Sequence, residues 1–554
     1  MNRPSSRASL ELFLASFLML FVELVVIRWA GAYVVYLSYF SNFVLLGSFL
    51  GIGLAFLRAK KRPDLFRWAP LLLLGFTAAT QAQPVLIDRS GSDLVFFGSV
   101  TFHGLPAWLV LPFVFLATTA ILAATAHGAA VRFQQFAPLD AYRLDILGSL
   151  AGVAAFALLA QLGAPPLAWA IVITILFVIL LDRWRIFQYL VLAGLIGVFG
   201  YSSFRPKQEW SPYYRVESLP QYIRVNGIPH QAMAKHIQGS FYQTPYLRLA
   251  VPPREVLVIG AGSGNDVAAA LGAGVAHVDA VEIDPAIQRF GAALHPHKPW
   301  ADSRVTPILD DGRAFLERTD KKYDLIVFAL PDSLTLVSGQ SAVRLESYLF
   351  TREAIAAARE RLAPGGVFAM YNFYRETWLL DRLAGTVRDV FGQAPCLEMG
   401  PESQDATVGR FAMFLATDET GRFSCATPWA PSSETAVLAP ATDDHPFVYL
   451  KERKVPARYL LTLGLILAVS FVLIRLVGGK ITSFKGGLDL FAMGAAFLLL
   501  ETMSVVRFAL LFGTTWYVNA LVFLGILIAV WLAIEIERRR PERPTGKLFP
   551  WVFL

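Results

Sequence analysis

Three glycines follow an apolar segment near the middle of the chain, at Gly260, Gly262 and Gly264. Glycines let a backbone approach a ligand closely, and the helix that follows directs its first amide groups at an anionic or polar group. Glu282 ends the next apolar segment, 18 residues after Gly264. A carboxylate there can accept both hydroxyls of a ribose, so these residues predict a nucleoside-binding site.

Three neighbouring side chains extend the predicted nucleoside site. Ser263 and Asn265 belong to the glycine-rich loop, and Asp311 follows the third of the apolar segments. A carboxylate accepts hydrogen bonds, so Asp311 is placed to hold an adenine amino group. The competing interpretation is an ordinary layer of strands and helices whose loop acids are solvated.

These residues lie on alternating strands and helices. Apolar, β-branched segments predict strands over 254–260, 276–283, 305–309, 323–330 and 366–372. The alternation predicts a Rossmann-like α/β fold with a doubly wound parallel sheet. Ahead of it, 213–217 and 222–227 predict a β-hairpin region with the turn Asn226-Gly227. We expect this region to cover the nucleoside site as a lid.

Long apolar runs dominate the rest of the chain. The 554 residues are 55% hydrophobic with a mean hydropathy of +0.51. A polytopic α-helical membrane protein of about ten spans is predicted, because about twenty apolar residues cross a bilayer. The predicted spans are 10–37, 39–57, 68–87, 106–126, 144–163, 165–181, 187–204, 457–477, 488–511 and 516–534. The predicted domains are 1–204 and 456–554, both transmembrane, and 205–455, the inserted α/β domain.

Charge and cysteine content exclude two other classes of function. The net charge of +7 comes with basic residues in short loops beside spans, such as Arg58-Ala-Lys-Lys-Arg62 and Arg538-Arg-Arg540. Membrane orientation explains these better than a nucleic-acid partner. The two cysteines, Cys396 and Cys425, predict neither a zinc site nor a disulfide framework, although a pairing of the two stays open.

Residues 211–392 resemble the spermidine synthase (polyamine aminopropyltransferase) family. The motifs that carry the resemblance are Ser211-Pro-Tyr213, Asn226-Gly-Ile, Gln231, Phe241-Tyr-Gln243, the glycine-rich loop, Val281-Glu-Ile-Asp284, Asp311-Gly312, Tyr323-Asp324 and Pro364-Gly-Gly366. The resemblance implies that Gln231, Tyr242 and Gln243 line the donor and acceptor pocket. It likewise implies that Glu282 binds the ribose and Asp311 the adenine. With its flanking spans, Asp443–Leu450 further resembles membrane-embedded members in bacteria.

Two positions depart from the pattern of that family. Ser263 stands where the family has an aspartate that holds the ammonium of the donor. Ala329-Leu-Pro-Asp-Ser333 aligns with the family's Asp-Ser-Ser-Asp-Pro, so only Asp332 remains as a candidate base. Asp332 is equally well interpreted as a helix cap or a loop acid. His295-Pro-His297 offers a second base, or a solvated loop.

The serine at position 263 bears on the choice of donor. Decarboxylated S-adenosylmethionine carries an ammonium that needs a carboxylate partner in a closed pocket. S-adenosylmethionine also carries a carboxylate, which Ser263 and the amides of Gly264 and Asn265 would accept. The sequence therefore favours S-adenosylmethionine or its thioether products over the decarboxylated donor, and we expect no metal.

Four charged residues interrupt the predicted spans: Glu23, Arg28, Glu501 and Arg507. A charge in hydrocarbon costs roughly 2.5 to 3.5 kcal/mol on insertion scales, so such residues usually pair or face a cavity. We expect Glu23 to pair with Arg28 or Arg507. These residues would bind a polar headgroup or clamp the terminal helices together.

The predicted function is a membrane-bound transferase that uses S-adenosylmethionine or a close analogue. Its acceptor would be a lipid or another membrane-associated molecule, since free putrescine does not require ten spans. The alternatives are a membrane-tethered aminopropyltransferase and a transporter or sensor with a regulatory nucleoside-binding domain. The sequence leaves a homo-oligomer open.

The predicted location is a bacterial inner membrane, but the side of the α/β domain is in conflict. Counting seven spans from a cytoplasmic N-terminus puts the basic loops inside and the domain outside. S-adenosylmethionine is supplied in the cytoplasm. On ligand supply alone, we expect the domain on the cytoplasmic side.

Overall fold

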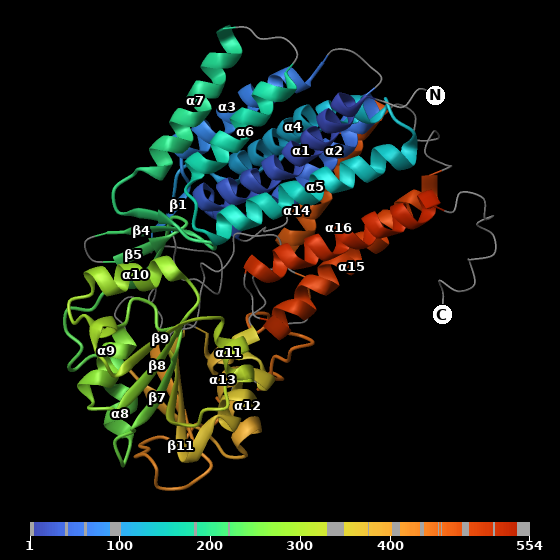
Figure 1. Cartoon of the computed structure of the whole chain (residues 1–554). Coiled ribbons are helices and arrows are strands. Elements are labelled where there is room, and N and C mark those ends of the chain that lie inside the picture. The colour runs from blue at the N-terminus through green and yellow to red at the C-terminus, as the bar shows by residue number, and fades with distance from the viewer. Residues whose placement is uncertain are drawn as a thin grey trace.

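The computed structural model contains a helical bundle and an α/β domain, which lie at opposite ends of the molecule (Figure 1). It describes residues 5–38, 43–59, 64–88, 101–181, 186–219, 222–329, 348–374, 376–400, 410–432, 437–451, 454–455, 457–478, 487–512 and 516–539.

A helix occupies each of the ten predicted apolar segments. These helices are α1 (Ser6–Tyr33), α2 (Phe43–Arg58), α3 (Ala69–Ala82), α4 (Ala107–Phe133), α5 (Pro138–Gln161), α6 (Pro166–Leu180), α7 (Ile186–Ser203), α14 (Ala457–Gly478), α15 (Leu488–Phe512) and α16 (Trp516–Arg539). Within the described residues, seven helices are long and apolar enough to cross a membrane. The others, α2, α3 and α6, have 16, 14 and 15 residues. The structure thus supports seven candidate spans and does not show ten.

The bundle is held together by buried apolar side chains and by glycines at close helix contacts. Helix α1 lies inside it, with a buried face that includes Phe21, Trp29 and Tyr33. A Cβ on Gly148 of α5 would lie 2.2 Å from the carbonyl oxygen of Phe13. Only glycine permits this approach, which brings α5 directly against α1.

The α/β domain is built on a seven-stranded sheet in the order β12-β13-β11-β10-β7-β8-β9. The strands are β7 (Glu255–Ile259), β8 (His277–Glu282), β9 (Val305–Leu309), β10 (Tyr323–Ala329), β11 (Leu362–Tyr374), β12 (Cys396–Met399) and β13 (Arg410–Ala416). Strands β7 to β11 are mutually parallel, and β13 and β12 add an antiparallel edge. The five predicted strands and the parallel sheet are confirmed.

Helices cover both faces of this sheet (Figure 1). On one side, α9 (Asn265–Gly272) packs on Val256 and Val258 of β7. On the other side, Leu257 and Ile259 of β7 share a core with three helices, α11 (Gly312–Arg318), α12 (Arg352–Glu360) and α13 (Thr377–Phe391). Alternate side chains of one strand therefore enter different cores. Burial on both faces explains why these strands are almost continuously apolar.

A second, four-stranded antiparallel sheet precedes the large one, in the order β3-β4-β5-β6. Its strands are β3 (Gln208–Trp210), β4 (Arg215–Ser218), β5 (Tyr222–Val225) and β6 (Ile228–Ala232). Asn226 and Gly227 have φ angles of 49° and 84° and form the turn between β5 and β6. The predicted turn is present, and the hairpin region is larger than predicted. This small sheet packs on α10 (Pro285–Leu294) through Val216, Ile223 and Ile287.

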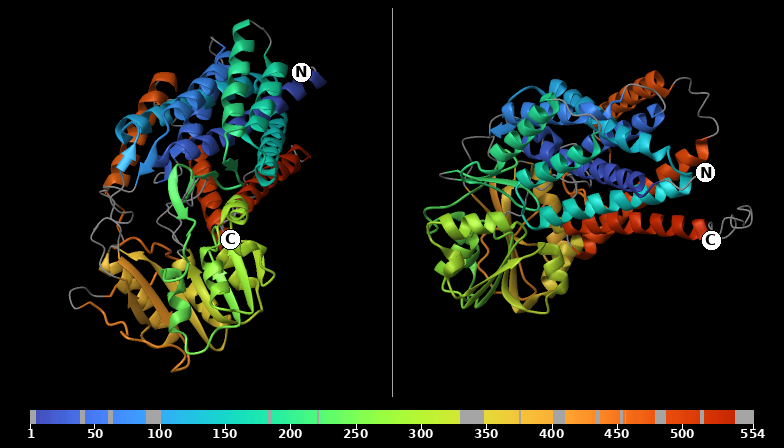
Figure 2. Two further views of the ribbon diagram at one scale, coloured as in Figure 1. Left: turned by 90° about the vertical axis from the view of Figure 1, so that its left-hand side faces the viewer. Right: turned by 45° about the horizontal axis from the view of Figure 1, so that its top comes forward.

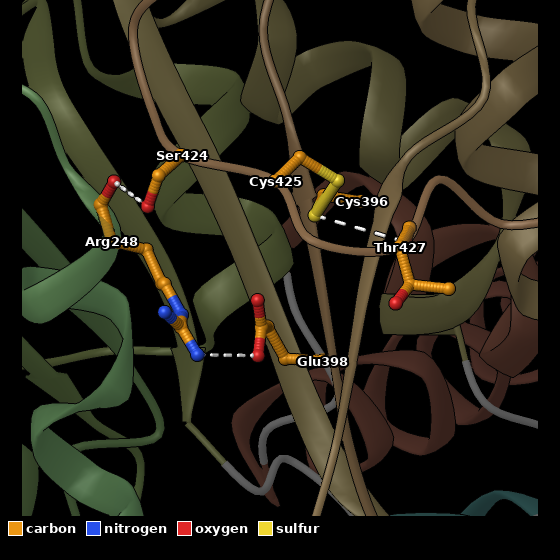
Figure 3. The surroundings of a disulfide bond; sticks show 6 residues. All are labelled: Arg248, Cys396, Glu398, Ser424, Cys425 and Thr427. Carbon is orange, nitrogen blue, oxygen red and sulfur yellow. Dashed lines mark hydrogen bonds and ion pairs between the residues drawn. A yellow bond between two sulfur atoms is a disulfide. The ribbon is translucent and has the colours of Figure 1, made fainter.

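Cys396 and Cys425 form a disulfide, which corrects the prediction that the cysteines build no framework (Figure 3). They lie 29 residues apart, with Cα atoms 5.6 Å from each other. The segment after β13 runs antiparallel to β12, where the amide of Leu397 donates to the carbonyl of Thr427 at 3.0 Å, and this pairing brings Cys425 to Cys396. Spacing along the chain alone does not reveal it. Next to the disulfide, Arg248 pairs with Glu398 at 2.9 Å (Figure 3).

Candidate functional site

The candidate site lies where the chain reverses its direction of travel across the sheet. From β7 the chain moves outward to β8 and β9, then returns to the other side of β7 to form β10 and β11. Adjacent strand ends diverge at such a switch point and leave a crevice at their carboxyl ends. The glycine-rich loop follows β7, Glu282 ends β8, and Asp311 follows β9.

The glycine-rich loop needs its glycines for both conformation and close packing. Gly260, Gly262 and Gly264 have φ angles of 81°, 57° and 107°, in the left-handed region. A Cβ on Gly262 would lie 2.3 Å from the side-chain oxygen of Gln231, and one on Gly264 would lie 2.6 Å from Cγ of Pro299. Both substitutions would be strained and would clash.

Glu282 is a buried carboxylate held by backbone amides. The amide of Gly262 donates to its Oε2 at 2.8 Å, and the amide of Asp284 donates to its Oε1 at 2.9 Å. Burial raises the pKa of Glu282 to about 7, against the lowering effect of these amides. Each carboxylate oxygen has a second lone pair, so Glu282 retains acceptor capacity for ribose hydroxyls.

Gln231 and Ser263 are brought together, as the predicted site requires. The amide of Ser263 donates to Oε1 of Gln231 at 2.7 Å, and the carbonyl of Ser263 accepts from Nε1 of Trp300 at 2.9 Å. The Ser263 hydroxyl is buried and has no hydrogen-bond partner among the residues that the structure describes. A buried polar atom without a partner is costly, so this hydroxyl is a candidate ligand contact.

The amide of Gly264 does not match its predicted role as a carboxylate donor. It donates to the carbonyl of Ala261 at 2.9 Å and so closes the loop on itself. Gly264 is the N-cap of α9 in a left-handed conformation. The amide that the sequence analysis assigned to a ligand therefore donates within the tight turn that the glycines permit.

The side chain of Asn265 is engaged in hydrogen bonds inside the protein, and the predicted role of its backbone amide stays a prediction. Its Nδ2 donates to the carbonyl of Ala232 at 2.7 Å and to the Tyr242 hydroxyl at 2.9 Å. Its Oδ1 accepts from the amide of Ala234 at 2.9 Å and lies 3.0 Å from Nε2 of His295. Asn265 thus clamps the segment after β6 and the Tyr242 turn onto α9.

His295 completes this clamp and is not placed as a base. Burial and the neighbouring His297 lower the pKa of His295 to about 4, so the ring is neutral at physiological pH. Its Nδ1 accepts from the amide of His297 at 3.2 Å, which leaves the proton on Nε2 for Asn265.

Gln243 is not brought to the loop. The side chain of Gln243 accepts from the amide of Gly239 at 3.0 Å and lies near Gly272, at the far end of α9. Asp332 lies outside the described residues. Its predicted role as a base stays a prediction.

Asp311 is the N-cap of α11, and its Oδ1 accepts from the amide of Ala314 at 3.0 Å. The preceding Asp310 pairs with Arg318. The carboxylate of Asp311 is therefore at the carboxyl edge of the sheet, as predicted for an adenine-binding group, but one of its oxygens caps the N-terminus of α11.

Sequence reasoning missed the importance of Ser211, Tyr213 and Asp284, which it quoted only as parts of motifs. The Ser211 hydroxyl donates to Oδ2 of Asp284 at 2.5 Å, while Oδ1 of Asp284 caps α10 through the amide of Ala286 at 2.7 Å. Burial raises the pKa of the Tyr213 hydroxyl, and so do the nearby carboxylates of Asp284, Asp311, Asp310 and Glu282.

A second buried acid, Asp266, was also missed. Tyr371 donates a hydrogen bond to its Oδ1. Burial raises the pKa of Asp266 to about 7, and the hydroxyls of Tyr242 and Tyr246 lie close enough to be affected by its charge. The group belongs to the core on the α9 side of the sheet.

The charged residues of the bundle do not pair as predicted. Arg28 donates to the carbonyls of Ser211 and Tyr213 in the segment before β4. Glu23 interacts electrostatically with Glu501, and its Oε1 has no hydrogen-bond partner within the described part of the chain. Arg507 is exposed on α15. Arg28 points to the α/β domain because it lies near the end of α1 that meets that domain.

The sheet defines a Rossmann-like α/β domain. Residues 230–396 match the spermine/spermidine synthase domain. This region of the chain is therefore similar to spermidine synthases.

Three curated relatives each match about a third of this chain. The polyamine aminopropyltransferase of Vibrio vulnificus is 27% identical over 176 residues, which are 30% of this chain and 54% of that protein. The enzyme of the same name from Nitrosomonas europaea is 29% identical over 195 residues, 33% of this chain and 57% of that protein. The putrescine N-methyltransferase 2 of Nicotiana attenuata is 26% identical over 178 residues, 31% of this chain and 43% of that protein. The chain spans about half the length of the first two relatives.

Among solved structures, the spermidine synthase of Thermotoga maritima aligns with 47% of this chain and 87% of its own, at 16% identity and a TM-score of 0.31.

Proposed function

We propose that this protein is a membrane-bound transferase that moves an alkyl group, methyl or aminopropyl, from an adenosyl sulfonium donor to a membrane-associated acceptor. The observation that carries the proposal is the buried Glu282 carboxylate beside the glycine-rich loop, at the switch point of the sheet. The polyamine aminopropyltransferases and the putrescine N-methyltransferase to which the chain is similar support the reaction class.

The reaction needs little from the protein besides binding and alignment. The lone pair of the acceptor forms a bond to the carbon on the sulfonium, the carbon–sulfur bond breaks, and its electron pair stays on sulfur as a thioether. The acceptor loses a proton to a base or to water. Holding the two reactants in line supplies most of the rate, so a weak or absent base is tolerable.

S-adenosylmethionine remains our proposed donor. Ser263 offers a hydroxyl and no carboxylate at the position where the resembling family holds an ammonium. This argument now rests on Ser263 without Gly264, because the amide of Gly264 is engaged with Ala261. The decarboxylated donor is the alternative, and direct titration separates the two.

A membrane-associated acceptor is proposed because the apolar bundle and the α/β domain are joined. The seven candidate spans and the contact of Arg28 with the segment before β4 support an acceptor that arrives from the bundle side. The same contact supports the second candidate function, a sensor in which nucleoside binding to the α/β domain changes the position of the bundle helices.

One experiment tests the proposal against both alternatives. The purified full chain is titrated calorimetrically with S-adenosylmethionine, its decarboxylated form and methylthioadenosine, and loss of donor is then followed in the presence of native membrane lipids. We expect S-adenosylmethionine to bind more tightly than the decarboxylated form and to be consumed. Tighter binding of the decarboxylated form would overturn the donor assignment, and binding without turnover would support the sensor.

A further inference from the structure

Arg28 of the bundle donates hydrogen bonds to the segment 211–213, at the start of the region that we expect to cover the nucleoside site as a lid. Its side chain is buried, and Nη2 donates to the carbonyl of Ser211 at 2.7 Å, while Nη1 donates to the carbonyl of Tyr213. The small sheet that follows this segment lies between the bundle and α10 (Figure 1). One guanidinium thus holds two backbone groups of the lid.

The same segment contacts the nucleoside site through its side chains. Ser211 donates to Asp284 at 2.5 Å, and the amide of Asp284 donates to Glu282 at 2.9 Å. Burial raises the pKa of the Tyr213 hydroxyl, and the charges of Asp284, Asp311 and Glu282 raise it further. A continuous set of polar contacts therefore runs from α1 to the carboxylate that we assign to ribose.

Aromatic packing makes this junction rigid. The ring of Trp210, which precedes the segment, lies 6.1 Å from that of Trp29 on α1 and 5.3 Å from that of Trp169 on α6. The Arg28 guanidinium lies 5.5 Å from the Trp210 ring, and that of Arg215 lies 4.2 Å from the Tyr33 ring. Movement of α1 would therefore move the lid.

We propose that Arg28 is a positioning residue, which fixes the segment 211–213 and, through the Ser211 hydroxyl and Asp284, the Glu282 carboxylate of the proposed nucleoside site. The site is then complete only when the bundle holds the lid, and occupancy of the site is coupled to the position of α1. This proposal rests on the proposed nucleoside binding. It adds a residue that touches neither donor nor acceptor.

The test compares Arg28→Met with Arg132→Met in the full chain. Arg132 is a matched control, because it also uses its guanidinium on two backbone carbonyls, those of Gly128 and Leu180, at the opposite end of the bundle. We expect Arg28→Met to weaken methylthioadenosine binding about 10-fold or more. Arg28→Lys should restore part of the affinity, and Arg132→Met should bind like the native chain.

Amide hydrogen exchange provides the second readout. In Arg28→Met, exchange should rise in 211–217 while 254–260 stays protected. Unchanged affinity together with unchanged exchange would overturn the proposal. If the native chain fails to bind the nucleoside, the proposed function fails, but the exchange of 211–217 still decides whether Arg28 holds the lid. If Arg28→Met loses protection in 254–260, the milder Arg28→Lys decides the question by the same two readouts.

A different set of observations bears on the side of the membrane. Helices α1 to α7 run alternately between an end beside the α/β domain and the opposite end, which we call the distal end. Beside the domain, Tyr33 of α1 lies 2.7 Å from Ser202 of α7, and Val34 pairs with Val85. At the distal end, Arg132 reaches the last turn of α6, and Arg143 pairs with Glu535 of α16 at 3.1 Å.

Basic residues beside the apolar helices are more numerous at the distal end than beside the α/β domain. Among the described residues, the distal end has Arg7, Arg58, Arg67, Arg132, Arg143, Arg538 and Arg539, and the end beside the domain has Arg205, Lys207, Lys451 and Lys454. Short loops that carry Lys and Arg face the cytoplasm. At the other end of the molecule, the α/β domain contains the disulfide of Cys396 and Cys425, and disulfides persist in oxidising compartments.

We infer that the α/β domain stands outside the cytoplasm and that the distal end faces the cytoplasm. Charge and disulfide agree on this orientation, against our expectation from ligand supply. The donor would then have to reach the outer face, by export or through the bundle.

Single cysteines at exposed positions test this orientation in intact cells. Lys322→Cys lies in the α/β domain and Arg7→Cys at the distal end, and within the described residues the native chain has no free thiol. We expect an impermeant maleimide to label Lys322→Cys in intact cells and Arg7→Cys only after permeabilisation. Labelling of Arg7→Cys alone, or of neither before permeabilisation, would overturn the inference.

Discussion

Glu282 combines two properties that rarely coexist on one side chain. It is buried, which disfavours its charge, and it accepts two backbone amides, which favour that charge. Burial dominates, and the pKa rises to about 7. The charge of the carboxylate that we propose binds ribose therefore changes near neutral pH.

Nucleoside affinity should consequently depend on pH through Glu282. The folded pKa of about 7 lies above the ordinary value of 4.5. The contribution of this group to stability is thus complete below about pH 4.5 and is lost as pH rises through about 7. Ligand binding should show the opposite trend, because the ionised carboxylate accepts ribose hydroxyls better. We expect methylthioadenosine affinity to rise between pH 6 and 8, and Glu282→Gln to abolish this dependence in calorimetric titrations; an identical pH profile in both proteins would contradict the assignment.

At the scale of single residues, the sequence predicted positions better than partners. Glu282 and the glycines were found because residue type and spacing in one loop define them. Gly264 was misassigned, since the partner of its amide, the carbonyl of Ala261, becomes visible only when the loop is folded. Arg28 was given the wrong partner because its contact lies more than 180 residues away along the chain.

Among the elements, the turn between β7 and α9 imposes the strictest geometry. Gly264 combines a φ of 107° with the close approach of Pro299 and Trp300. Gly274, at the end of the same helix, has a φ of 80° and open space around it. Comparing alanine substitutions at these two glycines therefore distinguishes the cost of backbone strain, which both share, from the cost of steric conflict, which only Gly264 has.

Gly264→Ala should therefore destabilise the α/β domain more than Gly274→Ala. We expect Gly274→Ala to cost about 1 kcal/mol through its left-handed backbone alone. Gly264→Ala should cost roughly 1 to 3 kcal/mol more, because a methyl group overpacks the loop. Denaturant unfolding of the purified chain measures both; equal losses would show that Pro299 and Trp300 yield without cost.

Strand elements were predictable because burial on both faces leaves an almost uninterrupted apolar run, as in β7 and β10. The edge strands β12 and β13 escaped prediction. Cys396 is the first residue of β12, but its disulfide partner, Cys425, lies beyond the end of β13. Pairing across an antiparallel edge is a property of the sheet and not of either segment.

For the whole molecule, the helical bundle and the α/β domain lie at opposite ends (Figure 2). The apolar segments were located correctly from composition. The structure does not show all ten of them as spans, because α2, α3 and α6 are shorter than a bilayer crossing usually requires. The domain bounds 1–204, 205–455 and 456–554 stay predictions.

The disulfide should stabilise the α/β domain of the complete protein. It closes a loop of 29 residues, for which chain-entropy arguments give about 3 to 4 kcal/mol. We expect Cys396→Ser with Cys425→Ser, or a reducing agent on the native chain, to lower the thermal midpoint by several degrees. The reducing agent should leave the double variant unchanged; an unchanged midpoint of the native chain would show that the thiols are not paired.

Replacement of Glu282 tests the central claim most directly. Calorimetric titration of methylthioadenosine compares the native chain with Glu282→Ala, and with Glu209→Ala as a control that removes an acid paired with Arg289 on the surface of the same domain. We predict at least about a 10-fold loss of affinity for Glu282→Ala and none for Glu209→Ala. Equal affinity of the native chain and a folded Glu282→Ala variant would contradict an adenosyl group anchored at the end of β8.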